Sequence, residues 1–98
     1  MSTDRVVERS FRVGSELGLH ARPAGEFVTL AGSFRADVSV SRGDEWVSGQ
    51  SVLSLLSLAA SQGTVLRIRA VGPDAEAAVE ALGTLVARGD APRRETGS

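Results

Sequence analysis

Apolar and polar residues alternate along several short stretches of the chain, as they do in strands with one buried face. The second of these stretches, for example, places Val38 and Val40 on one face and Asp37 and Ser39 on the other. The predicted strands are residues 6–13, 34–41, 45–48 and 64–71. A turn over residues 42–44 separates the second strand from the third, so these two are expected to form a hairpin.

Elsewhere apolar residues recur three or four positions apart, which predicts helices with one buried face. The predicted helices are residues 21–32, 51–60 and 75–88. Ser51 is suited to cap the middle helix, and Gly32 and Gly89 fit the ends of the other two. The order β-α-β-β-α-β-α predicts an α+β fold, in which three helices cover one face of a four-stranded, mainly antiparallel sheet.

The middle helix carries more large apolar residues than one buried face can use. Val52, Leu55 and Ala59 are expected to face inward together. Leu53 and Leu56 lie a turn apart on a different side, and a helix lying on a sheet cannot bury both sides. The sequence therefore predicts an exposed apolar patch at Leu53 and Leu56.

Composition limits what the chain can do. Its 98 residues fit one domain, taken as residues 1–89 with a loose start at 1–4 and a disordered tail at 90–98. It has no cysteine, one histidine and a formal charge of −1, so disulfides, a metal site and general attraction to nucleic acid are not expected. Without a signal peptide or a membrane-length apolar run, the protein is expected in the cytoplasm and not inserted in a membrane.

The single histidine, His20, stands where the first strand's loop meets the first helix. Pro23 fits the first turn of a helix that begins at Ala21, because its missing N–H would be unpaired there. The N–H groups of Ala21 and Arg22 then face an anion bound at His20, and the Arg22 guanidinium adds a fixed cation. These groups together suit a phosphoryl group held on an imidazole nitrogen.

Two segments carry a resemblance to a known family. The run Gly-Leu-His-Ala-Arg-Pro-Ala at residues 18–24 resembles the active-site signature of HPr, the histidine-containing phosphocarrier protein of the bacterial phosphotransferase system. Residues 49–58, followed by Gln62, Gly63 and Thr64, resemble the second signature region of that family in kind and spacing. The likeness extends from about Arg9 to Arg88.

The resemblance implies an open-faced β-sandwich in which His20 is phosphorylated at Nδ1 by enzyme I and passes the phosphoryl group to an enzyme IIA component. Arg22 would assist the transfer, with no cofactor, no metal and no catalysis outside the partner complexes, and a monomer would suffice. The first two helices would form the surface that binds the partners. Its expected members are Ala24, Phe27, Val52, Leu53 and Leu56.

Ser51 has two interpretations. In many HPr proteins the serine at this position is phosphorylated by a dedicated HPr kinase/phosphorylase, which would make Ser51 a regulatory site. It is also an ordinary helix cap, which needs no regulation to explain it. Gln50 stands where regulated relatives often have a basic residue, and this departure favours the structural interpretation.

Three alternatives to a sugar-transport carrier remain. A regulatory module that had lost transfer would not need His20, Arg22 and Pro23. A carrier in a nitrogen-related or regulatory phosphorelay would keep the same chemistry with other partners. A small-ligand binder of ferredoxin-like fold would leave the histidine signature without a role.

Overall fold

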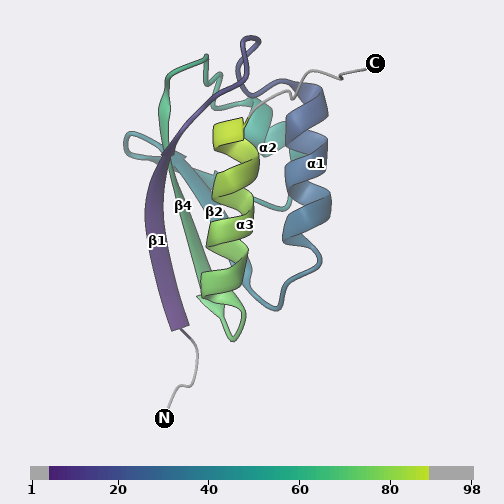
Figure 1. Ribbon diagram of the computed structural model, residues 1–98, viewed down its shortest axis with the longest axis vertical. Coiled ribbons are helices and arrows are strands. Elements are labelled where there is room, and N and C mark those ends of the chain that lie inside the picture. Colours follow the sequence, from purple (N-terminus) through teal and green to yellow (C-terminus); the bar gives the residue numbers. More distant parts are fainter. Residues whose placement is uncertain (1–4, 89–98) are drawn as a thin grey trace.

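The computed structural model describes residues 5–88, and it has the predicted order of elements (Figure 1). The elements are β1 (Arg5–Arg12), α1 (Ala21–Ala31), β2 (Asp37–Arg42), β3 (Glu45–Ser48), α2 (Val52–Leu56), β4 (Val65–Gly72) and α3 (Ala75–Arg88). The predictions for residues 1–4 and for the tail from residue 89 lie outside the described residues.

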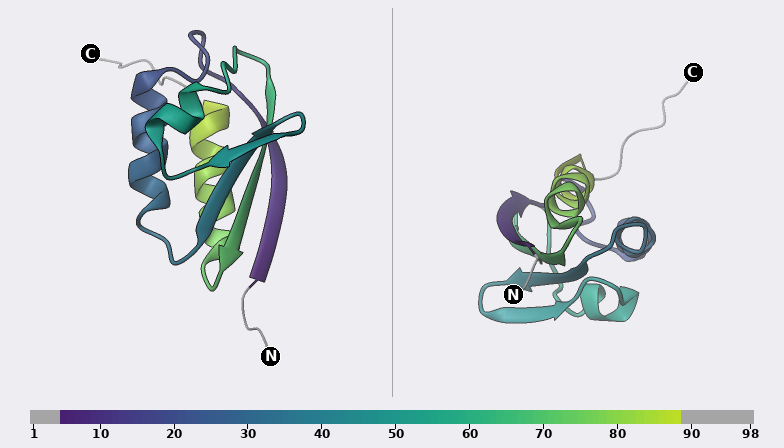
Figure 2. Two further views of the ribbon diagram at one scale, coloured as in Figure 1. Left: turned by 180° about the vertical axis from the view of Figure 1, so that it is seen from behind. Right: turned by 90° about the horizontal axis from the view of Figure 1, so that it is seen from below.

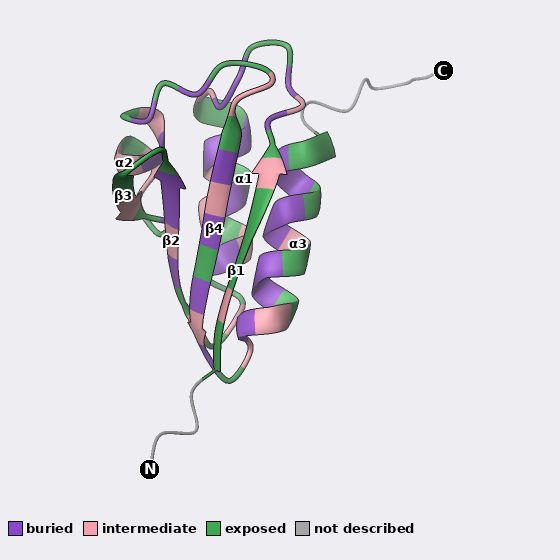
Figure 3. Ribbon diagram, turned by 90° about the vertical axis from the view of Figure 1, so that its left-hand side faces the viewer, coloured by how far each residue is buried: buried purple, intermediate pink, exposed green. Residues whose placement is uncertain are grey.

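The four strands form one sheet in the order β1-β4-β2-β3, and every pairing is antiparallel. Viewed from the β1 side, the helices lie behind the sheet and leave its other face open (Figure 3). Seen from below, the helices gather on one side of the strands (Figure 2). The predicted open-faced α+β fold is thereby confirmed.

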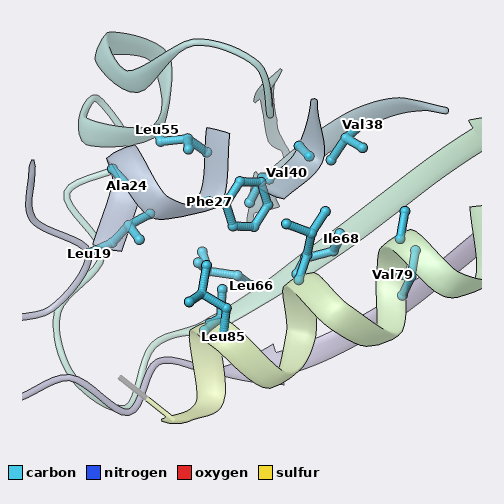
Figure 4. Close-up of a cluster of buried hydrophobic side chains, with 14 of the residues drawn as sticks. Leu19, Ala24, Phe27, Val38, Val40, Leu55, Leu66, Ile68, Val79 and Leu85 are labelled. Atoms are coloured by element: carbon cyan, nitrogen blue, oxygen red, sulfur yellow. The ribbon is translucent and has the colours of Figure 1, made fainter. Parts of the chain in front are cut away.

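The core lies between the sheet and the helices. In β4 the alternation is clear, because Leu66, Ile68 and Ala70 are fully buried while Arg67 and Arg69 point to the open face. Phe27 of α1 and Val40 of β2 meet these residues in one cluster (Figure 4). The predicted apolar face of α3 is also buried; it consists of Ala75, Ala78, Val79, Leu82, Leu85 and Val86.

Two predicted element bounds were wrong by three residues or more, and the other differences are one residue. β2 begins at Asp37 and not at Phe34, because the amides of Ser33 and Phe34 still donate to carbonyls of α1 in a tight turn. The middle helix ends at Leu56 and not at residue 60. These boundaries depend on turn geometry, which apolar spacing does not report.

The inward position predicted for Ala59 was also wrong, since Ala59 is exposed. Its φ of 51° is in the left-handed region, and it is the only residue other than glycine with a positive φ in the described chain. This local reversal turns Leu58 and Ala60 into the core in place of Ala59. The chain thereby leaves α2 and reaches the loop that carries His20.

Candidate functional site

His20 occupies the N-cap of α1, as predicted. Its backbone is extended, with φ −96° and ψ −172°, and its carbonyl accepts the amide of Ala24 at 3.0 Å. The His20 side chain does not cap the helix, and it is half-buried. The imidazole therefore stands at the start of α1 without using the hydrogen-bond donors of the first turn.

The loop before His20 is held against the segment that follows α2. Leu19 is 7% exposed, and its amide donates to the carbonyl of Ala60 at 2.8 Å. Gly18 has a φ of 75°, and a Cβ at this position would overlap the carbonyl of Ala60. A side chain at residue 18 is therefore excluded on two grounds, conformation and space. A small apolar cavity of about 10 Å³ remains beneath the loop.

The start of α1 offers two backbone donors. Pro23 is buried and has no N–H, and the Ala24 amide already donates to His20. In a helix the first amides lack partners within the helix, so those of Ala21 and Arg22 remain for a ligand. Their partial positive charge, together with the helix dipole, favours an anion at this end.

Arg22 projects from the first turn of α1 into solvent. Its side chain is 66% exposed, and its Nε lies 3.9 Å from Oε2 of Glu26, one turn further along. An exposed pair at this distance is weak, so it leaves the guanidinium able to turn toward an anion at the start of α1. Arg22 and Glu26 are the only charged residues of α1.

The expected docking surface has to be corrected. Ala24 is 0% and Phe27 1% exposed, so both belong to the core and neither can touch a partner. The surface of α1 near His20 instead shows Ala21, Arg22 and Glu26, beside a shallow hollow that also includes Gly25, Thr29 and Leu30. A Cβ added at Gly25 would meet no described atom within 4 Å.

On α2 the predicted patch is only partly present. Leu53 is 79% exposed, the most exposed of the large apolar side chains in the described chain. Val52 and Leu56 are half-buried and pack against the core. Figure 2 shows α2 beside the N-terminal end of α1, and the two helices are in contact. The apolar surface near His20 is therefore centred on Leu53.

Leu17, which no sequence pattern singled out, is 74% exposed in the loop that carries His20. A leucine between glutamate and glycine in a loop was a usable signal, because such a residue has no strand or helix face to join. With Leu53, it is one of two strongly exposed leucines in the described chain.

Ser51 caps α2 as predicted. Its Oγ accepts the amide of Ser54 at 3.2 Å, and its own backbone is extended. Within residues 5–88, no group of histidine, cysteine or acidic side chains is arranged to hold a metal ion. In the same span no helix is long and apolar enough to cross a membrane.

Comparison with known proteins agrees with this geometry. A family model described as the phosphorylation site of the HPr component of the phosphotransferase system matches residues 7–88. The chain belongs to the HPr family. It is therefore a phosphocarrier of the phosphotransferase system, and its partners are proteins of that system.

Individual relatives show how much of the chain is shared. Phosphocarrier protein HPr of Neisseria meningitidis serogroup A is 36% identical over 81 residues, 83% of this chain and 91% of that protein. Phosphocarrier protein NPr of Shewanella violacea is 38% identical over 80 residues, 82% of this chain and 88% of that protein. The crystal structure of HPr from Bacillus anthracis superposes with a TM-score of 0.79 at 37% identity, covering 83% of this chain and 96% of that one.

Proposed function

We propose that His20 Nδ1 accepts a phosphoryl group from the phosphohistidine of enzyme I and donates it to an enzyme IIA component. The observation that carries this proposal is the position of His20 at the N-cap of an eleven-residue helix. The amides of Ala21 and Arg22 at its start have no partner within the helix. A phosphoryl group on the imidazole would be within reach of partial and full positive charges.

The transfer balances without a cofactor. A nitrogen lone pair of His20 attacks phosphorus, a new P–N bond forms, and the P–N bond of the donor histidine breaks. The departing nitrogen of the donor keeps the electron pair and returns to neutral imidazole. Because one P–N bond replaces another, the step needs alignment and charge stabilisation more than a chemical driving force.

Arg22 is proposed to stabilise the equatorial phosphoryl oxygens during both transfers. A guanidinium can present two donors to such oxygens, and among residues 5–88 Arg22 has only the weak contact with Glu26. The amides of Ala21 and Arg22 would contribute hydrogen bonds that need no movement of the backbone.

We further propose that partners dock on the surface around Leu53, next to α1. Ser51 lies two residues away at the start of the same helix, so a phosphate there would place charge at the rim of this apolar surface. An apolar partner surface would then have to desolvate that charge. Regulation by an HPr kinase/phosphorylase would act by this route, with the carrier itself monomeric.

A relay outside sugar uptake is a second candidate function, because the NPr relative is about as similar to this chain as the HPr relative. The chemistry at His20 would be the same, and only the cognate partners would differ. Phosphorylation by sugar-type and nitrogen-type enzyme I proteins, compared side by side, would assign the pathway from the ratio of kcat/KM values.

The deciding experiment is incubation with enzyme I and phosphoenolpyruvate, followed by intact mass. One added phosphoryl group is expected, labile in acid and stable in base as a P–N bond is. An adduct that survives mild acid would contradict the assignment to a histidine.

A further inference from the structure

A single arginine of the β2–β3 hairpin joins that hairpin to the segment after α2. Nη1 of Arg42 donates to the carbonyl of Leu58 at 2.9 Å and to that of Ala59 at 3.0 Å. These two carbonyls belong to the peptide groups on either side of the Ala59 Cα. One nitrogen therefore holds both peptides that define the backbone conformation of Ala59.

That conformation costs free energy, because a residue with a Cβ is disfavoured in the left-handed region. Ala59 has a φ of 51°, and its side chain is exposed, so burial of the methyl group does not compensate. The two hydrogen bonds from Arg42 supply compensation, and they also satisfy carbonyls beyond the end of a short helix.

The next carbonyl along the chain supports His20. The carbonyl of Ala60 accepts the amide of Leu19 at 2.8 Å, and Leu19 directly precedes His20. Gly18 lies so close to Ala60 and Ser61 that a side chain at residue 18 would overlap their backbone. Any movement of the peptides around Ala59 is thereby passed to the loop that sets the position of the imidazole.

We infer that Arg42 is a positioning residue for His20, which acts through the Ala59 turn and the hydrogen bond between Ala60 and Leu19. This role requires no contact between Arg42 and the phosphoryl group or the partner protein. The Arg42 guanidinium fixes the position of the Ala60 carbonyl. The hydrogen bond from the Leu19 amide to that carbonyl then fixes the position of His20 at the start of α1. This inference rests on the proposed function only for its effect on transfer, since the contacts themselves are independent of it.

The first test is amide hydrogen exchange in Arg42→Met, Arg42→Lys and the matched control Arg69→Met. Arg69 is an exposed arginine of β4 with its side chain on the open face of the sheet. In Arg42→Met, the Leu19 amide should lose about tenfold in protection while the amides of β4 keep theirs. Because one nitrogen makes both contacts, the lysine ammonium should restore most of the protection, and Arg69→Met should change nothing.

The second test is steady-state phosphorylation by enzyme I. Misplacement of a reacting group within a docked complex lowers kcat, whereas loss of a docking contact raises KM. Arg42→Met should therefore lower kcat about tenfold with KM within about twofold of wild type. Arg42→Lys should recover kcat. Should Arg42→Met not fold, the kcat of Arg42→Lys is compared with that of Arg42→Gln in its place.

Three results would overturn the inference. Unchanged protection of the Leu19 amide in Arg42→Met would show that Arg42 does not hold the loop. Equal losses at Leu19 and throughout β4 would show a general stabilising role. A lysine variant as impaired as the methionine variant would exclude a contact made through one nitrogen. If enzyme I fails to phosphorylate wild type, the proposed function is wrong. The exchange measurement still shows whether Arg42 holds the His20 loop.

Discussion

The starts of α1 and α2 are built alike and used differently. Both have an N-cap residue with extended backbone, His20 in one case and Ser51 in the other. Ser51 uses its own Oγ to accept an amide of the helix, whereas the His20 side chain makes no such bond. One helix thus satisfies a donor of its first turn with its own cap, and the other begins at an imidazole that forms no cap bond.

Helix length explains why this division of labour is possible. α1 has eleven residues and buries Ala24, Phe27 and Ala31, so packing stabilises it without a side-chain cap. α2 has five residues and buries only Leu55. Such a short helix is marginal without its cap and its core contact. We therefore expect substitutions at the start of α1 to lower phosphoryl transfer more than the free energy of unfolding. Loss of the core contact of α2 should mainly lower the free energy of unfolding.

The largest effect is expected for His20→Ala. The variant should take up no phosphoryl group from enzyme I, while its free energy of unfolding should change by less than about 1 kcal/mol, because no cap bond is lost. Intact mass and a denaturation curve measure the two quantities. Ser51→Ala is the matched control, and it should still be phosphorylated. Phosphorylation of His20→Ala by enzyme I would show that another residue accepts the phosphoryl group.

The next prediction separates core from surface within α2. Leu55→Ala should lower the free energy of unfolding by about 2–5 kcal/mol, because Leu55 is fully buried. Leu53→Ala should cost under about 1 kcal/mol and raise the KM for enzyme I, because Leu53 is 79% exposed. Urea denaturation and transfer kinetics provide the measurements. A stable Leu53→Ala variant with unaltered KM would remove Leu53 from the docking surface.

Arg22→Ala should slow transfer by about tenfold with the thermal midpoint nearly unchanged, because it removes an exposed cation beside the phosphoryl group. Arg69→Ala is a suitable control, since it removes an exposed arginine from the other face of the sheet. Single-turnover transfer from phospho-enzyme I, normalised to folded protein, gives the rates. Equal rates for the two variants would mean that Arg22 has no part in the chemistry.

The smallest effect concerns the cap of α2. Ser51→Ala should lower the free energy of unfolding by about 1 kcal/mol through loss of the bond to the Ser54 amide. Ser51→Asp should be at least as stable as wild type, because a carboxylate can cap and is favoured at a helix start. The aspartate variant should nevertheless be a poorer substrate for enzyme I. A destabilised Ser51→Asp would contradict the proposed reason for its slower transfer.

Regular parts of the fold were predictable because their signal is local. The hairpin partner β3 and the helix α3 were placed at their observed bounds, since a polar turn marks the first and a long apolar face marks the second. The N-caps at His20 and Ser51 were likewise readable, because capping depends on residues within one turn.

Other features depended on contacts between distant segments. The spacing in α1 showed that Ala24 and Phe27 share a face, and the resemblance suggested that partners use that helix. That suggestion conflicts with the buried stripe that the spacing itself predicts, and only the packed structure shows that the spacing was right. In the same way, the left-handed turn at Ala59 is set by Arg42, seventeen residues earlier.

The sequence alone determined the kind of fold, the single histidine and its place before a helix, because periodicity and capping are properties of neighbouring residues. Only the tertiary structure decided which surface remains free for a partner and how the His20 loop is held. Those features arise from the Ala60 carbonyl, the Arg42 guanidinium and the packing of α2 against α1, which the fold brings together from separate parts of the chain.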